Sequence, residues 1–358
     1  MPVAGVPVKG VATMGEVRGF GITHYPPLSG SDETMAYILE NTLRDPHIPE
    51  SEKDPATWPP AMQAEWADER KAAAAHRADL VACLDTVRSA IDEFAPDLVV
   101  MWGDDQYELF REEVVPPFCV LAFDDTTVRP FASRSSANAW GEGAEHEVTV
   151  RMSRAIGRQF TSELLHAGFD VAYAYKQRDG AGFPHAFLNA LLYLDYHRDK
   201  GFPYTILPIS VNCYGSKVIA FRGGMARPEA GTALDPPSPS PHRCMQLGAA
   251  VARIAEESPY RVALLASSGW SHAFLTDKTW RLRPDVDADR RLYDALVTGD
   301  LGAWHTYRTA ELEEAGQQEM LNWFCLLGAM EELGRKPRWS ELLESYIFNS
   351  SKVFAVFD

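Results

Sequence analysis

The sequence is poor in cysteine, in long apolar runs and in positive charge, and each shortage excludes a class of protein. Its five cysteines are odd in number and show no Cys-x-x-Cys spacing. This pattern argues against a disulfide framework or a zinc knuckle and predicts a reducing, cytoplasmic location. No signal peptide is recognisable, and no apolar run approaches the roughly 20 residues of a membrane-spanning helix. A formal net charge of −16 argues against nucleic acid or an anionic membrane as partner.

Apolar runs of strand length alternate with segments of helical periodicity along the chain. We expect strands at 17–24, 98–102, 170–175, 205–212 and 261–266. We expect helices over 61–94, 147–167, 243–257, 285–298 and 308–332. Two Pro-rich stretches, about 25–60 and about 227–242, predict an irregular excursion and a surface loop. The alternation predicts a single α/β domain over residues 1–358, with a central, mostly parallel sheet flanked by helices.

Two residues far apart in the sequence suit a metal centre. His24 follows the first expected strand, and Glu319 lies in an apolar helical segment. A carboxylate in such a helix is costly unless a cation pairs with it. Taken alone, His24 could be a turn residue before Pro26, and Glu319 could have a salt-bridge partner on the helix surface. Brought together by folding, they supply two parts of a two-His, one-carboxylate metal site.

Further polar residues follow two other expected strands. Asp104, Asp105 and Gln106 come after the strand at 98–102, and His272 follows the small residues of 267–269. Binding sites in open α/β sheets form at the carboxyl ends of the strands, so these side chains are expected at one edge. An imidazole there can take up and return a proton near pH 7. We interpret His272 as the acid–base residue, the alternative being a buried His bonded to the main chain.

Six segments in the same order resemble a known family of enzymes. The chain resembles the catalytic beta subunit of protocatechuate 4,5-dioxygenase, a class III (type II) extradiol ring-cleavage dioxygenase. The resemblance lies in Gly21–Leu28, Pro96–Gln106, Ile206–Asn212, Arg243–Gly248, Ser267–His272 and Gly316–Ala329. It implies the extradiol dioxygenase fold and a mononuclear Fe(II) held by two His and one Glu, with open positions for a catecholate and O₂.

The resemblance places His24 and Glu319 as metal ligands, but the chain departs from the family at the second His. The matching position is Gln106, which we take as the third ligand through its carbonyl oxygen. Asp105 is one alternative ligand. A His from elsewhere, either His76 or His47, is the other.

A second departure affects the substrate pocket. The resemblance implies an acid–base role for His272 and a further substrate-contacting His, whose position here is Asp179. His185, just after Pro184, is the alternative residue for that role. The change suggests a different substrate within the same fold.

The resemblance implies O₂-dependent extradiol cleavage of a catechol-type aromatic acid, such as a protocatechuate-, gallate- or methylgallate-like compound. Two other hypotheses stay open: a hydrolytic zinc enzyme with the same fold, and a metal-free binding protein. The expected partners are a catechol substrate and O₂, with a possible homodimer. No separate small subunit is evident from the sequence.

Overall fold

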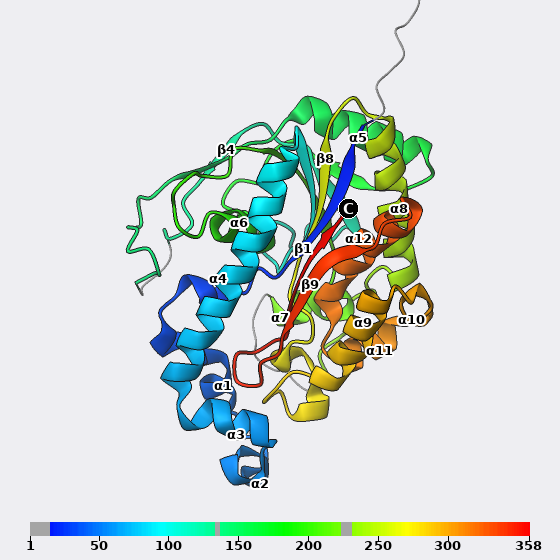
Figure 1. The fold of residues 1–358 in the computed structure, drawn as a ribbon. Helices are drawn as coiled ribbons and strands as arrows, with labels where there is room; N and C mark the ends of the chain where they lie inside the picture. The colour runs from blue at the N-terminus through cyan, green and yellow to red at the C-terminus, as the bar shows by residue number, and fades with distance from the viewer. Residues whose placement is uncertain (1–14, 133–136, 223–230) are drawn as a thin grey trace, which may run out of the picture.

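The fold is organised around a large mixed sheet with the strand order β6-β3-β7-β2-β8-β1-β10-β9 (Figure 1). The structure is a computed structural model that describes residues 15–132, 137–222 and 231–358. The strands of the sheet are β1 (Val17–Ile22), β2 (Leu98–Asp104), β3 (Phe118–Leu121), β6 (Ala172–Ala174), β7 (Thr205–Val211), β8 (Val262–Ser267), β9 (Pro337–Leu343) and β10 (Lys352–Phe357). A separate ribbon pairs β4 (Thr126–Val128) with β5 (Val148–Val150).

The centre of the sheet is parallel. Strands β7, β2, β8 and β1 are parallel neighbours, whereas β3 with β7, β1 with β10 and β10 with β9 pair antiparallel. Every residue of β2 and of β8 is buried, because both faces of the sheet are covered. The prediction of an α/β fold with a mostly parallel sheet flanked by helices is therefore confirmed.

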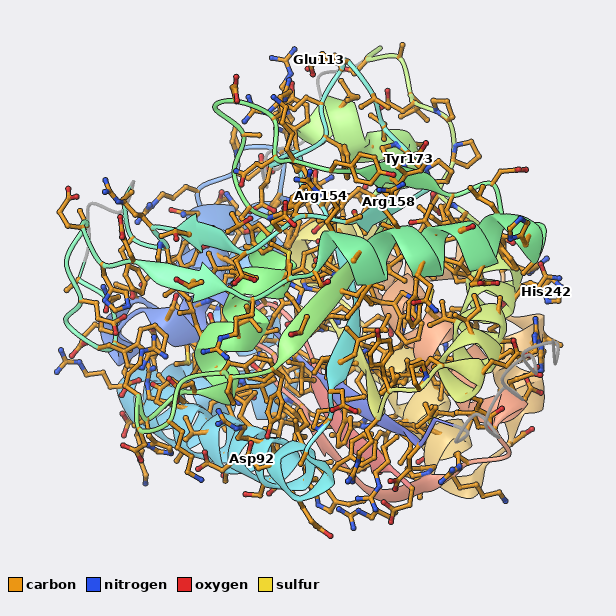
Figure 2. All side chains as sticks on the ribbon, turned by 90° about the horizontal axis from the view of Figure 1, so that it is seen from above. Asp92, Glu113, Arg154, Arg158, Tyr173 and His242 are labelled. Carbon is orange, nitrogen blue, oxygen red and sulfur yellow. The ribbon has the colours of Figure 1, made fainter. Side chains whose placement is uncertain are left out.

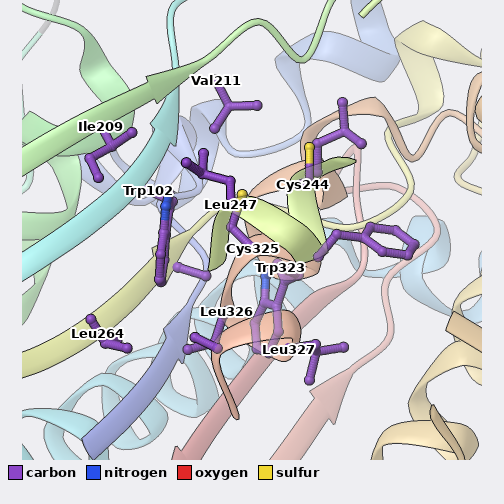
Figure 3. Packing of buried hydrophobic residues seen from close by; sticks show 14 of the residues in the cluster. Trp102, Ile209, Val211, Cys244, Leu247, Leu264, Trp323, Cys325, Leu326 and Leu327 are labelled. Carbon is purple, nitrogen blue, oxygen red and sulfur yellow. The ribbon is translucent and has the colours of Figure 1, made fainter. Parts of the chain in front are cut away.

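Helices cover the two faces of the sheet (Figure 1). One face packs against α4 (Glu69–Phe94) and α6 (His185–Leu194), and the other against α5 (Arg154–His166), α8 (Pro241–Glu257) and α12 (Leu321–Glu332). Figure 3 shows Trp102, Leu264 and Leu326 in the core on the α8 and α12 side. The apolar strand runs therefore account for two cores, one on each side of the sheet.

Helices α8 and α12 approach each other closely through two glycines. A Cβ atom at Gly248 would lie 1.7 Å from the Cys325 carbonyl oxygen, and one at Gly328 would lie 2.1 Å from that of Met245. Helix α12 is also seated on β1, where a Cβ at Gly21 would meet the Trp323 ring at 2.1 Å. This packing determines where the residues just before α12 lie relative to the end of β1.

Several expected helices are shorter or divided. The helix predicted at 61–94 is α3 (Pro60–Ala67) followed by α4, because Asp68 breaks the first and caps the second by accepting from the Lys71 amide. The segment at 308–332 divides into α11 (Thr309–Glu314), the 3-10 turn η7 (Gln318–Met320) and α12. Gly316 lies between them with φ +71°, a conformation that ends a helix.

The two Pro-rich stretches differ in their outcome. The excursion at 25–60 folds into short helical turns: η1 (Pro26–Ser29), η2 (Asp32–Thr34), α1 (Tyr37–Thr42), α2 (Glu50–Lys53) and η3 (Pro55–Thr57). Of the expected loop at 227–242, residues 227–230 lie outside the described residues. The remainder is irregular only as far as Ser240, because α8 begins at Pro241, two residues before the expected start of that helix.

The remaining elements lie towards the carboxyl half and the sheet edge. They are η4 (Gly215–Lys217), α7 (Val218–Phe221), η5 (Ala273–Leu275), η6 (Asp277–Thr279), α9 (Val286–Thr298) and α10 (Leu301–Thr306). At the β6 edge, Figure 2 shows Arg154, Arg158 and Tyr173 near one another, and both arginines lie over the Tyr175 ring at 5.8 and 6.0 Å. Charged side chains thus cover this short edge strand, which opposes pairing with another chain. Among the described helices, none combines the length and the apolarity that a membrane crossing requires.

Candidate metal centre

The carboxyl ends of the central parallel strands open into one cavity. His24 follows β1, Gln106 follows β2 and His272 follows β8, and all three line a cavity of about 280 Å³. The other lining residues are Pro26, Tyr37, Ile38, His185, Phe274, Glu319 and Asn349. The expectation that polar residues at these strand ends lie together agrees with this arrangement.

His24 presents one ring nitrogen to the centre of this cavity. Its side chain is buried, and Nδ1 lies 3.0 Å from the Ser267 carbonyl oxygen. A carbonyl only accepts, so Nδ1 carries the proton and Nε2 holds a lone pair. Nε2 lies 3.8 Å from Oε2 of Glu319. Burial, followed by the nearby His185, lowers the pKa of His24 to about 3, so the ring is neutral at pH 7.

His272 is held in the same way and also approaches Glu319. Its Nδ1 donates to the Trp270 carbonyl oxygen over 2.8 Å, and its Nε2 lies 3.4 Å from the Glu319 Oε2. Burial lowers the pKa of His272, so this ring too is neutral. The two rings therefore direct lone pairs, rather than protons, towards one carboxylate oxygen.

Glu319 has one oxygen with a partner and one without. The Tyr214 hydroxyl donates to Oε1 over 2.7 Å, whereas Oε2 is buried and has no hydrogen-bond partner. A buried carboxylate oxygen facing two imidazole lone pairs is unfavourable unless a cation lies between them. Ring nitrogens whose other N–H is bound to a carbonyl are also the usual form of metal-ligating His. The residues present therefore fit a divalent metal ion.

A second group of possible ligands adjoins the first. Ligand atoms of His24, Asp104 and His185 lie within 4.8 Å of one another. Asp104, the last residue of β2, is fully buried, and neither carboxyl oxygen has a hydrogen-bond partner. Burial, with a contribution from Glu319, raises the pKa of Asp104 well above its usual value.

His185 is oriented by a carboxylate instead of the backbone. Its ring meets that of His24 edge-on, with 5.0 Å between centroids. Its Nδ1 and its backbone amide both lie 3.1 Å from the Glu108 carboxylate. Burial opposes the charged imidazolium, but Glu108, with Asp104 and Glu319, outweighs it, and together they raise the pKa of His185 to about 10. The sequence predicts that His185 lies near the substrate. In the structure it also contacts His24, a candidate metal ligand.

The alternatives to Gln106 as third ligand are placed differently. The Asp105 carboxylate accepts from the amides of Glu108, Leu109 and Phe110, so it caps the turn after β2. His76 is buried against Phe348, with 5.1 Å between ring centroids, and is not a lining residue of the cavity. His47 has an exposed ring bonded to Asp45. Of the four candidates, the structure brings Gln106 alone to the cavity wall.

Asp179 is not brought to this centre. Asp179 is exposed. It lines neither the cavity of about 280 Å³ nor a second cavity of about 640 Å³, whose lining includes Arg129. Its expected role at the substrate has no support from the structure, because the turn that carries it points to solvent. The first residue of α6, His185, occupies the cavity wall instead.

Two residues of the centre went unrecognised in the sequence. Asp104 belongs to the polar cluster after 98–102, but that cluster gives no reason to prefer it over its neighbour Asp105. Tyr214 follows the strand at 205–211, and the sequence carries no signal for its bond to Glu319. Position at a strand end was the usable signal for Asp104 alone.

The comparisons with known proteins concern about half of the chain. Residues 231–356 match the family described as "Catalytic LigB subunit of aromatic ring-opening dioxygenase". The 2,3-dihydroxyphenylpropionate/2,3-dihydroxicinnamic acid 1,2-dioxygenase 2 of Pseudomonas putida is 28% identical over 185 residues, 52% of this chain and 46% of that protein. An enzyme of the same kind from Klebsiella pneumoniae subsp. pneumoniae is 28% identical over 216 residues, 59% of this chain and 53% of that protein.

The chain spans about half the length of these curated relatives. The matched segment contains both His272 and Glu319, two of the residues around the cavity. The resemblance to class III extradiol dioxygenases therefore agrees with the match of residues 231–356 to the family of catalytic LigB subunits of aromatic ring-opening dioxygenases.

Proposed function

We propose that this protein cleaves a catechol-type ring with O₂ at a metal centre held by His24 and Glu319. The observation that carries the proposal is the unpartnered Oε2 of Glu319, which faces the Nε2 atoms of two neutral imidazoles. The family match over 231–356 and the dioxygenase names of the relatives support the same reaction class. Fe(II) suits this mixed nitrogen and oxygen donor set, and when bound it would supply open coordination positions and one-electron chemistry for O₂.

His272 is suited to move the substrate proton. Its Nδ1–H is held by the Trp270 carbonyl, so Nε2 is the atom that can accept a proton from a catechol hydroxyl. Because burial lowers its pKa, the ring is neutral and ready to accept at pH 7. Protonated His272 would be stabilised by Glu319, 3.4 Å away, and would return the proton to the opened product.

The cavity also limits the substrate. Its volume of about 280 Å³ accommodates a single aromatic ring, and Tyr37, Ile38 and Phe274 provide apolar walls. No lysine or arginine is among its described lining residues, so a carboxylate attached directly to the ring would find no ammonium or guanidinium partner there.

A second cavity of about 640 Å³ shares Pro26 and His185 with the first, and its lining includes Arg129. Within the expected class of catechol acids, we therefore propose a substrate that carries its carboxylate on a side chain instead of on the ring. The relatives are named for such compounds, with a propionate or cinnamate chain.

Oxygen uptake is the test of this proposal. The protein is purified anaerobically, loaded with Fe(II) and supplied with protocatechuate, gallate, 2,3-dihydroxyphenylpropionate and an uncharged alkylcatechol in an oxygen electrode. We expect stoichiometric uptake and a yellow ring-opened product, fastest with the side-chain acid, and loss of both in His24→Ala and Glu319→Ala. The exposed His197→Ala variant is the control and keeps the activity. Bound metal without uptake for any catechol would contradict the proposal and point to the hydrolytic alternative.

A further inference from the structure

We propose that His185 supplies the metal-binding imidazole that the chain lacks at position 106, with Asp104 as the adjoining carboxylate, and that Gln106 is not a ligand. The inference rests on the proposed function, because it concerns the same metal centre. It starts from the close grouping of His24, Asp104 and His185, whose ligand atoms lie within 4.8 Å of one another.

Backbone packing brings the two residues together. A Cβ atom at Gly103 would lie 2.8 Å from the Phe187 ring and 3.1 Å from the Ala186 Cβ. The last residues of β2 therefore lie directly against the first turn of α6. Asp104 is the next residue of β2 and His185 is the first residue of α6, so this contact places them side by side.

The orientation of His185 matches that of a metal ligand. Nδ1 is held by the Glu108 carboxylate at 3.1 Å, and the His185 amide, also 3.1 Å away, fixes the same carboxylate. A carboxylate that holds one ring nitrogen while the other faces a metal is a recurring arrangement around metal-bound His. His24 and His272 show the equivalent arrangement with carbonyl oxygens.

Asp104 lacks a hydrogen-bond partner among the described residues. Its side chain is fully buried, and both of its oxygens lack a hydrogen bond. Glu319 adds a second buried carboxyl to the same centre, and the cavity has no described lysine or arginine in its wall. The nearby buried Nζ of Lys352 donates to the Phe348 carbonyl oxygen. A divalent cation bound beside Asp104 would satisfy these carboxyl groups together.

Gln106 is the weaker candidate on chemical grounds. It lines the cavity, but it is a neutral amide and is more exposed than Asp104. An amide oxygen suits Mg²⁺, Ca²⁺ or Mn²⁺, whereas an imidazole nitrogen suits iron. If His185 takes the ligand role, it releases its second ring proton when the metal binds. The donor set then keeps two imidazoles and Glu319, and Asp104 adds a further negative charge.

The test measures the binding of Co²⁺ alone to the metal-free protein. The affinity comes from isothermal titration calorimetry, and the ligand set is monitored by the visible ligand-field spectrum of the bound ion. The variants are His185→Gln, Asp104→Asn and Gln106→Ala, with His76→Gln as a buried His outside the cavity. We expect His185→Gln and Asp104→Asn each to weaken Co²⁺ binding by about 100-fold or more, since even the outer partners of metal ligands are worth about 10–100-fold. We expect Gln106→Ala and His76→Gln to keep the wild-type affinity and spectrum.

Two outcomes would contradict the inference. If Gln106→Ala weakens binding and His185→Gln does not, the inference is wrong and the proposed function stands. If the wild-type protein binds no Co²⁺ in the cavity, both fail. Circular dichroism melting of each variant separates loss of binding from loss of folding. For any variant that does not fold, Glu108→Gln is the substitute: it retains the His185 ring and should weaken Co²⁺ binding by about 10-fold.

Discussion

The two halves of the candidate metal centre are built in different ways. In the half formed by β1, β8 and the start of α12, His24 and His272 donate to backbone carbonyl oxygens, and their side chains are 2% and 7% exposed. In the half formed by β2 and α6, His185 is held by the side chain of Glu108 and its own side chain is 21% exposed. A backbone carbonyl has no alternative position, whereas a partly exposed carboxylate can move or change its charge.

The difference in how the His rings are held indicates which half of the site is the more rigid. The half containing His24, His272 and Glu319 is tied to the core by Trp323, whose ring occupies the space beside Gly21. In the half containing Asp104, Gln106 and His185, the geometry depends on a side-chain ion pair at the cavity wall. We infer that the first half is the more rigid support of the metal and that the second is the more adjustable part of the site.

The largest effect is expected from Glu319→Gln, which breaks the first half. The amide keeps the bond to Tyr214 but removes the charge that faces His24 and His272. We expect metal content measured by mass spectrometry to fall to background and O₂ uptake to stop, because loss of a ligand exceeds the roughly 10–100-fold cost of losing its outer partner. Glu331→Gln, at an exposed ion pair with His305, is the control. Full metal occupancy in Glu319→Gln would show that this carboxylate is not a ligand.

Gly328→Ala tests the scaffold beneath the first half. Its Cβ would lie 2.1 Å from the Met245 carbonyl oxygen, so α8 and α12 must separate. We expect the free energy of unfolding, from urea denaturation, to fall by about 1–3 kcal/mol and the metal affinity to fall with it, since α12 positions Glu319. Gly143→Ala, where nothing lies within 4 Å of the added atom, should change neither. If Gly328→Ala is destabilised but keeps its metal affinity, the packing of α8 against α12 does not determine metal binding.

Tyr214→Phe removes the one hydrogen bond described for the Glu319 carboxylate. Without the 2.7 Å bond to Oε1, Glu319 loses its orientation, and we expect metal affinity to fall by about 10-fold. Calorimetric titration of the metal-free variant gives the value. Tyr173→Phe, at an exposed position, is the matched control. An unchanged dissociation constant would mean that packing alone orients Glu319.

The smallest effect is expected from Glu108→Gln, which tests the ion pair that holds His185 in the second half. Glu108, with Asp104 and Glu319, raises the pKa of His185 to about 10, and the pKa should fall towards 6.5 in the variant, as followed by NMR titration of the ring. Because the pKa of His185 is raised by folding, its pairing stabilises the wild type fully below about pH 6.5 and ceases to do so as the pH rises through about 10. The unfolding free energies of the two proteins should therefore converge at high pH. A difference that persists above pH 10 would exclude the ion pair as its cause.

The sequence predicted most of the fold and the grouping of three polar residues around one cavity. His24, His272 and Glu319 could be placed because two follow expected strands and all three lie in segments that resemble the family. The position of Asp104 beside His185 could not, because it depends on the contact between Gly103 and the first turn of α6. The hairpin of β9 and β10 was also missed, and with it the antiparallel pairing of β10 to β1.

Anomalous diffraction from crystals grown with Fe(II) under anaerobic conditions tests the central claim most directly. The account predicts one strong peak at the iron edge within bonding distance of His24 Nε2 and Glu319 Oε2, on the side of Asp104 and His185. A cavity without a peak, or a peak that does not contact Glu319, would contradict it.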